Sequence, residues 1–172
     1  MRNRLALVVM ALALVPPAAA AAASPMSPGG IGVGPHGYDF LVGSWTCKNS
    51  IPSPMGGPAV TTVFIAHTAD GALWVHVTGT GFDALGYVVY APKTKTWWNP
   101  ASSVSGGYGT ESTQQTGKKS VWSGPFTDPS SGKTMQVRDT YTFTNPTTYT
   151  DLYQVEMNGT WKTEGNSTCT KG

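Results

Sequence analysis

The sequence has little charge of either sign. Charged residues make up 12% of the 172 residues, with 11 Lys and Arg against 9 Asp and Glu. Two of the basic residues, Arg2 and Arg4, lie in an N-terminal segment that we expect to be removed, which leaves 9 of each sign. Nucleic-acid binding needs clustered cations that displace phosphate counterions. Only Lys118 and Lys119 are adjacent after residue 4, so we predict no nucleic-acid partner.

Cysteine and histidine are also scarce. Cys47 and Cys169 are too few for a structural zinc site, and they lack C-x-x-C redox spacing. In an oxidising compartment two cysteines usually pair. A disulfide that closes so long a loop would stabilise the fold by about 4–5 kcal/mol in the entropic model. We therefore predict a disulfide. No H-x-H or HExxH spacing is present, so His67 and His76 are interpreted as ordinary strand histidines, with no metal or cofactor predicted.

Long apolar runs are absent beyond the N-terminus. Residues 5–15 are apolar but too short to span a bilayer, and with Arg2, Arg4 and the alanines at 18–23 they predict a cleaved signal peptide over residues 1–23. Residues 24–37 are rich in Pro and Gly and predict a flexible leader. We therefore expect an exported protein, periplasmic or secreted, whose domain spans residues 38–172 and has no membrane span after cleavage. The oligomeric state is not predicted.

Helical periodicity and the motifs of common enzymes are missing from residues 38–172, where there is no G-x-S-x-G elbow, P-loop or nucleotide fingerprint. Short runs rich in Val, Thr, Tyr and Trp alternate instead with turn pairs such as Asp70-Gly71 and Asn158-Gly159. They predict about ten strands, at 45–49, 60–68, 73–80, 85–91, 96–99, 108–114, 120–123, 134–143, 149–157 and 160–170.

Strands joined in this way form an all-β, antiparallel, up-and-down sheet. Such a sheet has two unpaired edges unless it closes into a barrel. Cys47 lies in the first predicted strand and Cys169 in the last, and closure makes those strands neighbours. A β-sandwich could also bring the two cysteines together, but a single barrel of roughly 8–10 strands, preceded by a short helical turn, is the favoured fold.

The first strand also carries a family resemblance. Residues 38–45 read Tyr-Asp-Phe-Leu-Val-Gly-Ser-Trp, and their Gly43-x-Trp45 resembles the structural G-x-W opening of lipocalins. Residues 86–95, Trp122-Ser-Gly and 158–161 extend the resemblance to the bacterial lipocalin-like family DUF1579. The resemblance implies a barrel of eight to ten strands and no agreed activity. In lipocalins an Arg on one of the last strands lies over the Trp of the G-x-W motif. In this sequence Arg138 is the only Arg after residue 4, and it lies well before the last predicted strand. Related nitrobindin-like barrels bind haem through a late His, and none follows His76, so haem is not expected.

Two carboxylates fall on predicted apolar strand faces. Asp139 shares its face with Tyr141, and Asp151 shares its face with Tyr153. For these two faces to match across the hairpin, the connecting loop must contain an odd number of residues. With the shortest such loop, Asp139 lies opposite Tyr153 and Asp151 lies opposite Tyr141. A buried carboxyl must find a partner or take up a proton, and paired carboxylates can perform acid–base chemistry. These four residues are therefore the catalytic candidates. The alternatives are that the Tyr hydroxyls satisfy structural carboxylates, or that Asp151, near the turn, is solvated.

Aromatic residues are plentiful. Trp97 and Trp98 must point to opposite faces of an extended strand. Aromatic rings at the mouth of a barrel suit stacking on an apolar or sugar-like ligand, although large rings can also simply fill a small barrel. The ligand-binding candidates are Trp97, Trp98, Tyr87, Tyr90, Tyr108 and Asp139.

These features favour an exported barrel that binds a small apolar or aromatic molecule. One alternative is a small barrel enzyme, an isomerase or hydrolase that uses interior Asp and Tyr side chains. Another is a filled barrel that serves as a structural or protein-interaction module. The choice depends on whether the barrel is hollow, which follows from strand tilt and stagger rather than from the sequence pattern.

Overall fold

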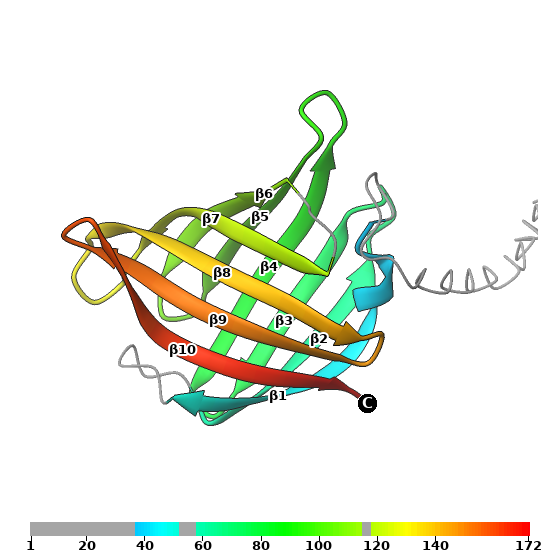
Figure 1. Ribbon diagram of the computed structural model, residues 1–172, viewed down its shortest axis with the longest axis horizontal. Helices are drawn as coiled ribbons and strands as arrows, with labels where there is room; N and C mark the ends of the chain where they lie inside the picture. Colours follow the sequence, from blue (N-terminus) through cyan, green and yellow to red (C-terminus); the bar gives the residue numbers. More distant parts are fainter. Residues whose placement is uncertain (1–36, 52–57, 115–117) are drawn as a thin grey trace, which may run out of the picture.

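The structure, a computed structural model, describes residues 37–51, 58–114 and 118–172. A 3-10 turn, η1 (Asp39–Leu41), precedes ten antiparallel strands that follow one another around a closed barrel (Figure 1). The strands are β1 (Gly43–Ile51), β2 (Val60–His67), β3 (Leu73–Gly79), β4 (Phe82–Ala91), β5 (Thr96–Ser103), β6 (Tyr108–Thr113), β7 (Lys119–Thr127), β8 (Thr134–Asn145), β9 (Thr148–Met157) and β10 (Thr160–Lys171).

The barrel closes between its first and last strands. Strand β1 pairs with β10, and Cys47 lies directly opposite Cys169 in their register. The two cysteines form a disulfide across a sequence separation of 122 residues. The predicted antiparallel up-and-down barrel and the predicted disulfide are therefore both present, and closure leaves no unpaired sheet edge.

Alternation along the strands decides which side chains enter the barrel. In β3, Leu73 points inward and is 2% exposed, whereas Trp74 packs against Phe64 of β2 on the outer wall with 5.9 Å between ring centroids. Turns between strands use residues that tolerate positive φ: Asn158 and Gly159, with φ of 53° and 75°, join β9 to β10 in a two-residue hairpin. Inward-facing side chains thus form the core, and the outer wall carries several exposed apolar residues.

One end of the barrel is filled by aromatic side chains. The turn η1 lies at this end, near the β8–β9 hairpin and the C-terminus (Figure 1). Tyr38, Trp45, Trp97 and Trp122 are all buried here, and the Tyr38 ring meets the Trp97 ring edge-on at 4.8 Å. These four residues are called the aromatic plug below.

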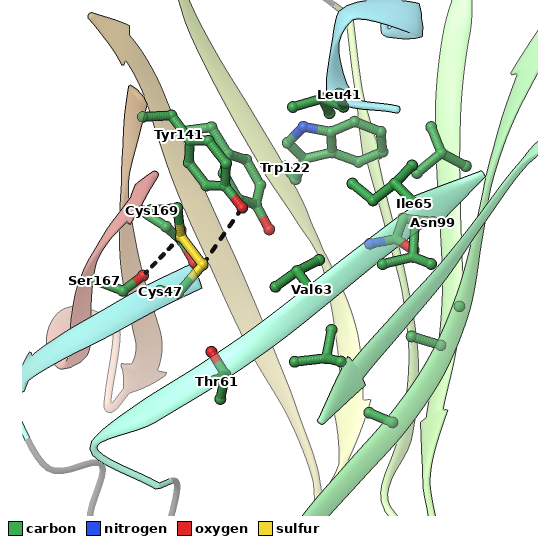
Figure 2. A pocket seen from close by; sticks show the side chains of 18 of the residues that line it. Leu41, Cys47, Thr61, Val63, Ile65, Asn99, Trp122, Tyr141, Ser167 and Cys169 are labelled. Carbon is green, nitrogen blue, oxygen red and sulfur yellow. Dashed lines mark hydrogen bonds between the residues drawn. A yellow bond between two sulfur atoms is a disulfide. The ribbon is translucent and has the colours of Figure 1, made fainter. Parts of the chain in front are cut away.

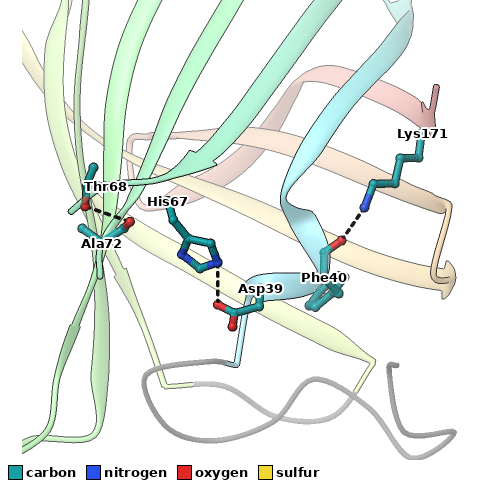
Figure 3. Close-up of polar contacts among 6 residues, drawn as sticks. All are labelled: Asp39, Phe40, His67, Thr68, Ala72 and Lys171. Atoms are coloured by element: carbon teal, nitrogen blue, oxygen red, sulfur yellow. Dashed lines mark hydrogen bonds and ion pairs between the residues drawn. The ribbon is translucent and has the colours of Figure 1, made fainter. Parts of the chain in front are cut away.

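A lysine fastens the turn η1 to the plug. Trp45 donates a hydrogen bond from Nε1 to the carbonyl oxygen of Leu41 at 2.7 Å. The Lys171 ammonium lies 5.4 Å from the Trp45 ring centroid and donates to the carbonyl oxygen of Phe40 at 3.0 Å (Figure 3). A lysine on the last strand therefore covers the motif tryptophan, where the sequence offered no late arginine. Arg138 instead lies over Trp161, 4.3 Å from its ring centroid.

Candidate ligand-binding cavity

The barrel is hollow. An outer cavity of about 820 Å³ reaches the end of the barrel formed by the β3–β4, β5–β6 and β7–β8 turns. A smaller inner cavity of about 270 Å³ extends toward the aromatic plug. The two cavities share Ala84, Asn99 and Ala101 in their walls, and Ala101 is solvent-exposed although its strand position faces inward. The alternative of a barrel whose interior is completely filled by side chains is not compatible with these two cavities.

Apolar side chains form most of the inner cavity. Val63 and Ile65 of β2 face Trp122 and the Cys47–Cys169 disulfide across it, with Leu41 of η1 at its end (Figure 2). The Tyr149 hydroxyl lies 3.7 Å from Cys47 Sγ. An apolar ligand group can replace water here without losing hydrogen bonds, which favours an aliphatic or aromatic occupant.

Three carboxyl groups from three strands meet in the barrel interior. Glu111 of β6 and Asp139 of β8 line the outer cavity, and Asp151 of β9 lines the inner one. Asp139 lies opposite Tyr153 and Asp151 opposite Tyr141, which is the register that the face pattern predicts. The Asp139 carboxyl shares hydrogen bonds with both Glu111 and Asp151, so it is the centre of the group. We call Glu111, Asp139 and Asp151 the acid cluster.

Burial makes the acid cluster hold protons. Burial, and then the neighbouring Asp139 charge, raise the pKa of Glu111 to about 10, and the same causes raise the pKa of Asp151 well above its ordinary value. Burial also raises the pKa of Asp139 to about 6, although its hydrogen bonds to the other two carboxyls favour its ionised form. The three carboxyls are hydrogen-bonded to one another and titrate as a unit, and their raised pKa values keep the cluster partly protonated near neutral pH.

The tyrosines beside the cluster remain neutral. Burial is the main cause that raises the pKa of Tyr141, Tyr149 and Tyr153, and the nearby carboxylates raise it further. Their rings also form the wall: Tyr141 and Tyr149 are 5.8 Å apart between centroids. The four catalytic candidates from the sequence, Asp139, Asp151, Tyr141 and Tyr153, are thus brought together around one interior site.

Several acceptor oxygens at the site have no hydrogen-bond partner within the protein. They are Glu111 Oε1, Asp151 Oδ1 and Asn99 Oδ1, and Asn99 lies directly opposite Glu111 in the β5–β6 register. Most buried polar atoms in proteins are hydrogen-bonded, so each of these exceptions requires an explanation. Neither Glu111 nor Asn99 was a candidate from the sequence.

The aromatic candidates lie elsewhere. Trp97 packs in the aromatic plug with Tyr90, 5.0 Å between centroids. Trp98, Tyr87 and Tyr108 lie on the outer wall, 44%, 46% and 60% exposed. None of the five lines either cavity. Asp139 alone of the ligand-binding candidates lines a cavity.

The two strand histidines are separate from each other and from the cavities. His67 Nε2 lies 3.6 Å from Asp39 Oδ1 (Figure 3), and His76 Nε2 lies 3.0 Å from Asp83 Oδ1. Over the described ranges, no three His, Cys, Asp or Glu side chains are grouped so that they could hold a metal ion.

No protein-family model matches the sequence, and no curated protein matches it. Among the residues that the structure describes, no helix is long and apolar enough to cross a membrane.

Proposed function

We propose that this protein binds a small, largely apolar or aromatic molecule inside its barrel. The observation that carries this proposal is the pair of adjoining cavities, of about 820 and 270 Å³, with walls supplied by inward-facing strand residues. Known small-molecule sites are clefts of several hundred Å³, mostly apolar, with a few polar groups that orient the ligand. The acid cluster supplies those polar groups at the boundary between the two cavities.

Export and a lipocalin-like ancestry belong to the same proposal. The Cys47–Cys169 disulfide supports an oxidising compartment, since such bonds persist mainly in exported proteins. The resemblance to DUF1579 rests on the Gly43-x-Trp45 opening, which lies just after the turn η1 at the start of β1, and Lys171 takes the place over the indole that an Arg has in typical lipocalins. These are arguments from architecture and leave the ligand to be decided by the site itself.

A small barrel enzyme is the second candidate. Asp139 lines the outer cavity with Tyr153 opposite it, and its pKa of about 6 suits proton transfer near neutral pH. Perturbed groups of this kind occur in binding sites as well as in active sites, so binding is the simpler proposal.

The cavity can be tested with a neutral fluorescent probe, N-phenyl-1-naphthylamine, whose emission rises in apolar surroundings. We expect saturable binding to the full chain. Ala101→Phe should abolish it, because Ala101 belongs to the walls of both cavities. Ser123→Phe adds the same ring to an exposed position on β7 and should leave binding unchanged.

Native mass spectrometry of protein purified from its own host provides a second measurement. An additional mass that is released on denaturation would give the size of the natural ligand. Failure of the probe to bind, together with a bare native mass, would refute the proposed function.

A further inference from the structure

The interior of the barrel has an excess of hydrogen-bond acceptors. Among the described residues, four buried side-chain oxygens have no partner: the Tyr38 hydroxyl in the aromatic plug, and the acceptors Glu111 Oε1, Asp151 Oδ1 and Asn99 Oδ1 around the acid cluster. Among the described residues that line the two cavities there is no Lys, Arg or His. The unpartnered atoms around the acid cluster are therefore acceptors, and a ligand bound in the cavity can supply donors to them.

The three acceptors come from strands on both sides of Asp139. Glu111 and Asn99 face each other across β5 and β6, while Asp151 lies on β9, on the far side of Asp139 from Glu111. The acid cluster adjoins both cavities, with Asp151 on the inner one and Glu111 and Asp139 on the outer one. A compact group with several N–H donors, placed between the cavities, can reach more than one of these oxygens. An ammonium group has three such donors.

The protonation of the cluster is consistent with an occupant of positive charge. Burial raises the pKa of all three carboxyls, so the cluster is partly protonated near neutral pH and can lose further protons. The other titratable groups that face the cluster are the phenols of Tyr141, Tyr149 and Tyr153, with Glu164 near Tyr153, and none of them is cationic. A bound cation would favour the ionised carboxyls, and its binding would release protons.

We propose that the acid cluster binds the ammonium group of a small organic amine, whose apolar or aromatic part occupies the adjoining cavity. This inference rests on the proposed function and specifies its ligand class. The apolar part would lie against residues such as Val63 and Ile65 of the inner cavity or Phe126 of the outer one. Affinity for the amine increases with pH as the cluster loses its protons, most steeply around the pKa of Asp139, about 6.

Three probes with one indole body separate the contribution of charge from that of apolar contact. Tryptamine carries an ammonium group, tryptophol a hydroxyl and indole-3-acetate a carboxylate. Each is used to displace N-phenyl-1-naphthylamine from the full chain at pH 7.5. We expect tryptamine to bind about 10- to 100-fold more tightly than tryptophol, as charge-assisted hydrogen bonds imply, and indole-3-acetate to bind least.

Variants of the acid cluster test whether its carboxyl groups cause the preference for tryptamine over tryptophol. Asp139→Asn and Asp151→Asn should bring tryptamine to within about threefold of tryptophol, while tryptophol itself binds as before. Glu156→Gln removes a carboxylate from the outer face of β9 and should leave the preference intact. Circular dichroism and binding of the naphthylamine probe confirm that each variant is folded and hollow.

The outcomes distinguish this inference from the proposed function. If the naphthylamine binds but tryptamine is no better than tryptophol, the barrel binds small molecules and the amine inference is wrong. A preference for indole-3-acetate would also overturn it, since the protonated carboxyls would then act as donors to an anion. Tryptamine affinity that does not change between pH 5 and pH 8 would contradict the role of the acid cluster. Absence of any probe binding, together with a bare native mass, would refute the proposed function itself.

Discussion

Replacement of Glu111 by Gln should make the protein more stable at neutral pH. Burial raises the pKa of Glu111 from 4.5 to about 10 in the folded protein. Below pH 4.5 the carboxyl is protonated in both the folded and the unfolded chain, and it imposes no penalty. Above pH 4.5 only the unfolded chain ionises, so stability falls with rising pH until the folded pKa is reached.

The size of this effect follows from the raised pKa. Each pH unit over which only the unfolded chain ionises costs about 1.4 kcal/mol, so Glu111 should cost about 3 kcal/mol by pH 7. Asp139 acts in the same direction, with a loss that ends near its folded pKa of about 6. The two groups share protons, so their costs do not simply add. A few kcal/mol is a large part of the 5–15 kcal/mol typical of a whole domain.

The assay is urea unfolding followed by tryptophan fluorescence at pH 4.5, 5.5, 6.5 and 7.5. Glu111→Gln keeps the shape of the side chain and a donor for Asp139, so its stability should match the unmodified protein at pH 4.5 and exceed it by about 3 kcal/mol at pH 7. Glu156→Gln, on the outer wall, is the control. Local hydrogen bonds lower the pKa values of Asp70 and Asp128. The contribution of these two carboxylates to stability is therefore lost only at more acidic pH, outside the range of this assay. Parallel pH profiles for Glu111→Gln and the unmodified protein would refute this reasoning.

Three further predictions concern the frame of the barrel. The double variant Cys47→Ser/Cys169→Ser should lose about 4–5 kcal/mol in urea unfolding, because the disulfide closes nearly the whole domain, and an unchanged midpoint would contradict this. Lys171→Met should lose about 1–2 kcal/mol by removing the cation over Trp45 and a hydrogen bond to Phe40, whereas Lys171→Arg should retain most of it. Gly124→Ala should cost about 3 kcal/mol, because the added Cβ would lie 2.0 Å from the carbonyl oxygen of Thr110 on β6. Gly165→Ala is the control and should be tolerated, since its Cβ would lie 3.5 Å from its nearest neighbour. Equal urea midpoints for the two variants would argue against close contact of β6 and β7.

The parts of the structure that the sequence predicts are those governed by local periodicity. Alternation along residues 134–157 gives both the inward face and the register, and Asp139 does lie opposite Tyr153. Positions 97 and 98 point to opposite faces for the same reason, with Trp97 3% and Trp98 44% exposed. Two cysteines in the first and last strands then select a closed barrel over an open sheet.

The missed residues have no such pattern. Glu111 shares its strand face with Gly109 and Thr113, and neither marks that face as the interior. Strand β5 was expected to end at residue 99, yet it continues to Ser103 through Pro100, which places Ala101 in the cavity wall. The position of Lys171 over Trp45 has no signal in the sequence, since the lipocalin pattern has an arginine there. Alternation shows which side chains of a strand share a face but not which face is the interior, so the sequence alone does not predict that Tyr87 and Tyr108 point outward.

The cost of the acid cluster is itself an argument about function. A barrel with only a structural role would gain stability from an amide or an apolar side chain at position 111, because the carboxyl is buried and one of its oxygens is unpartnered. The binding hypothesis predicts two linked effects of Glu111→Gln: greater stability at neutral pH and a weaker preference for tryptamine over tryptophol. A purely structural carboxyl predicts the first effect alone. Measuring both on the same variant therefore separates a group retained for its ligand from one that merely occupies the wall.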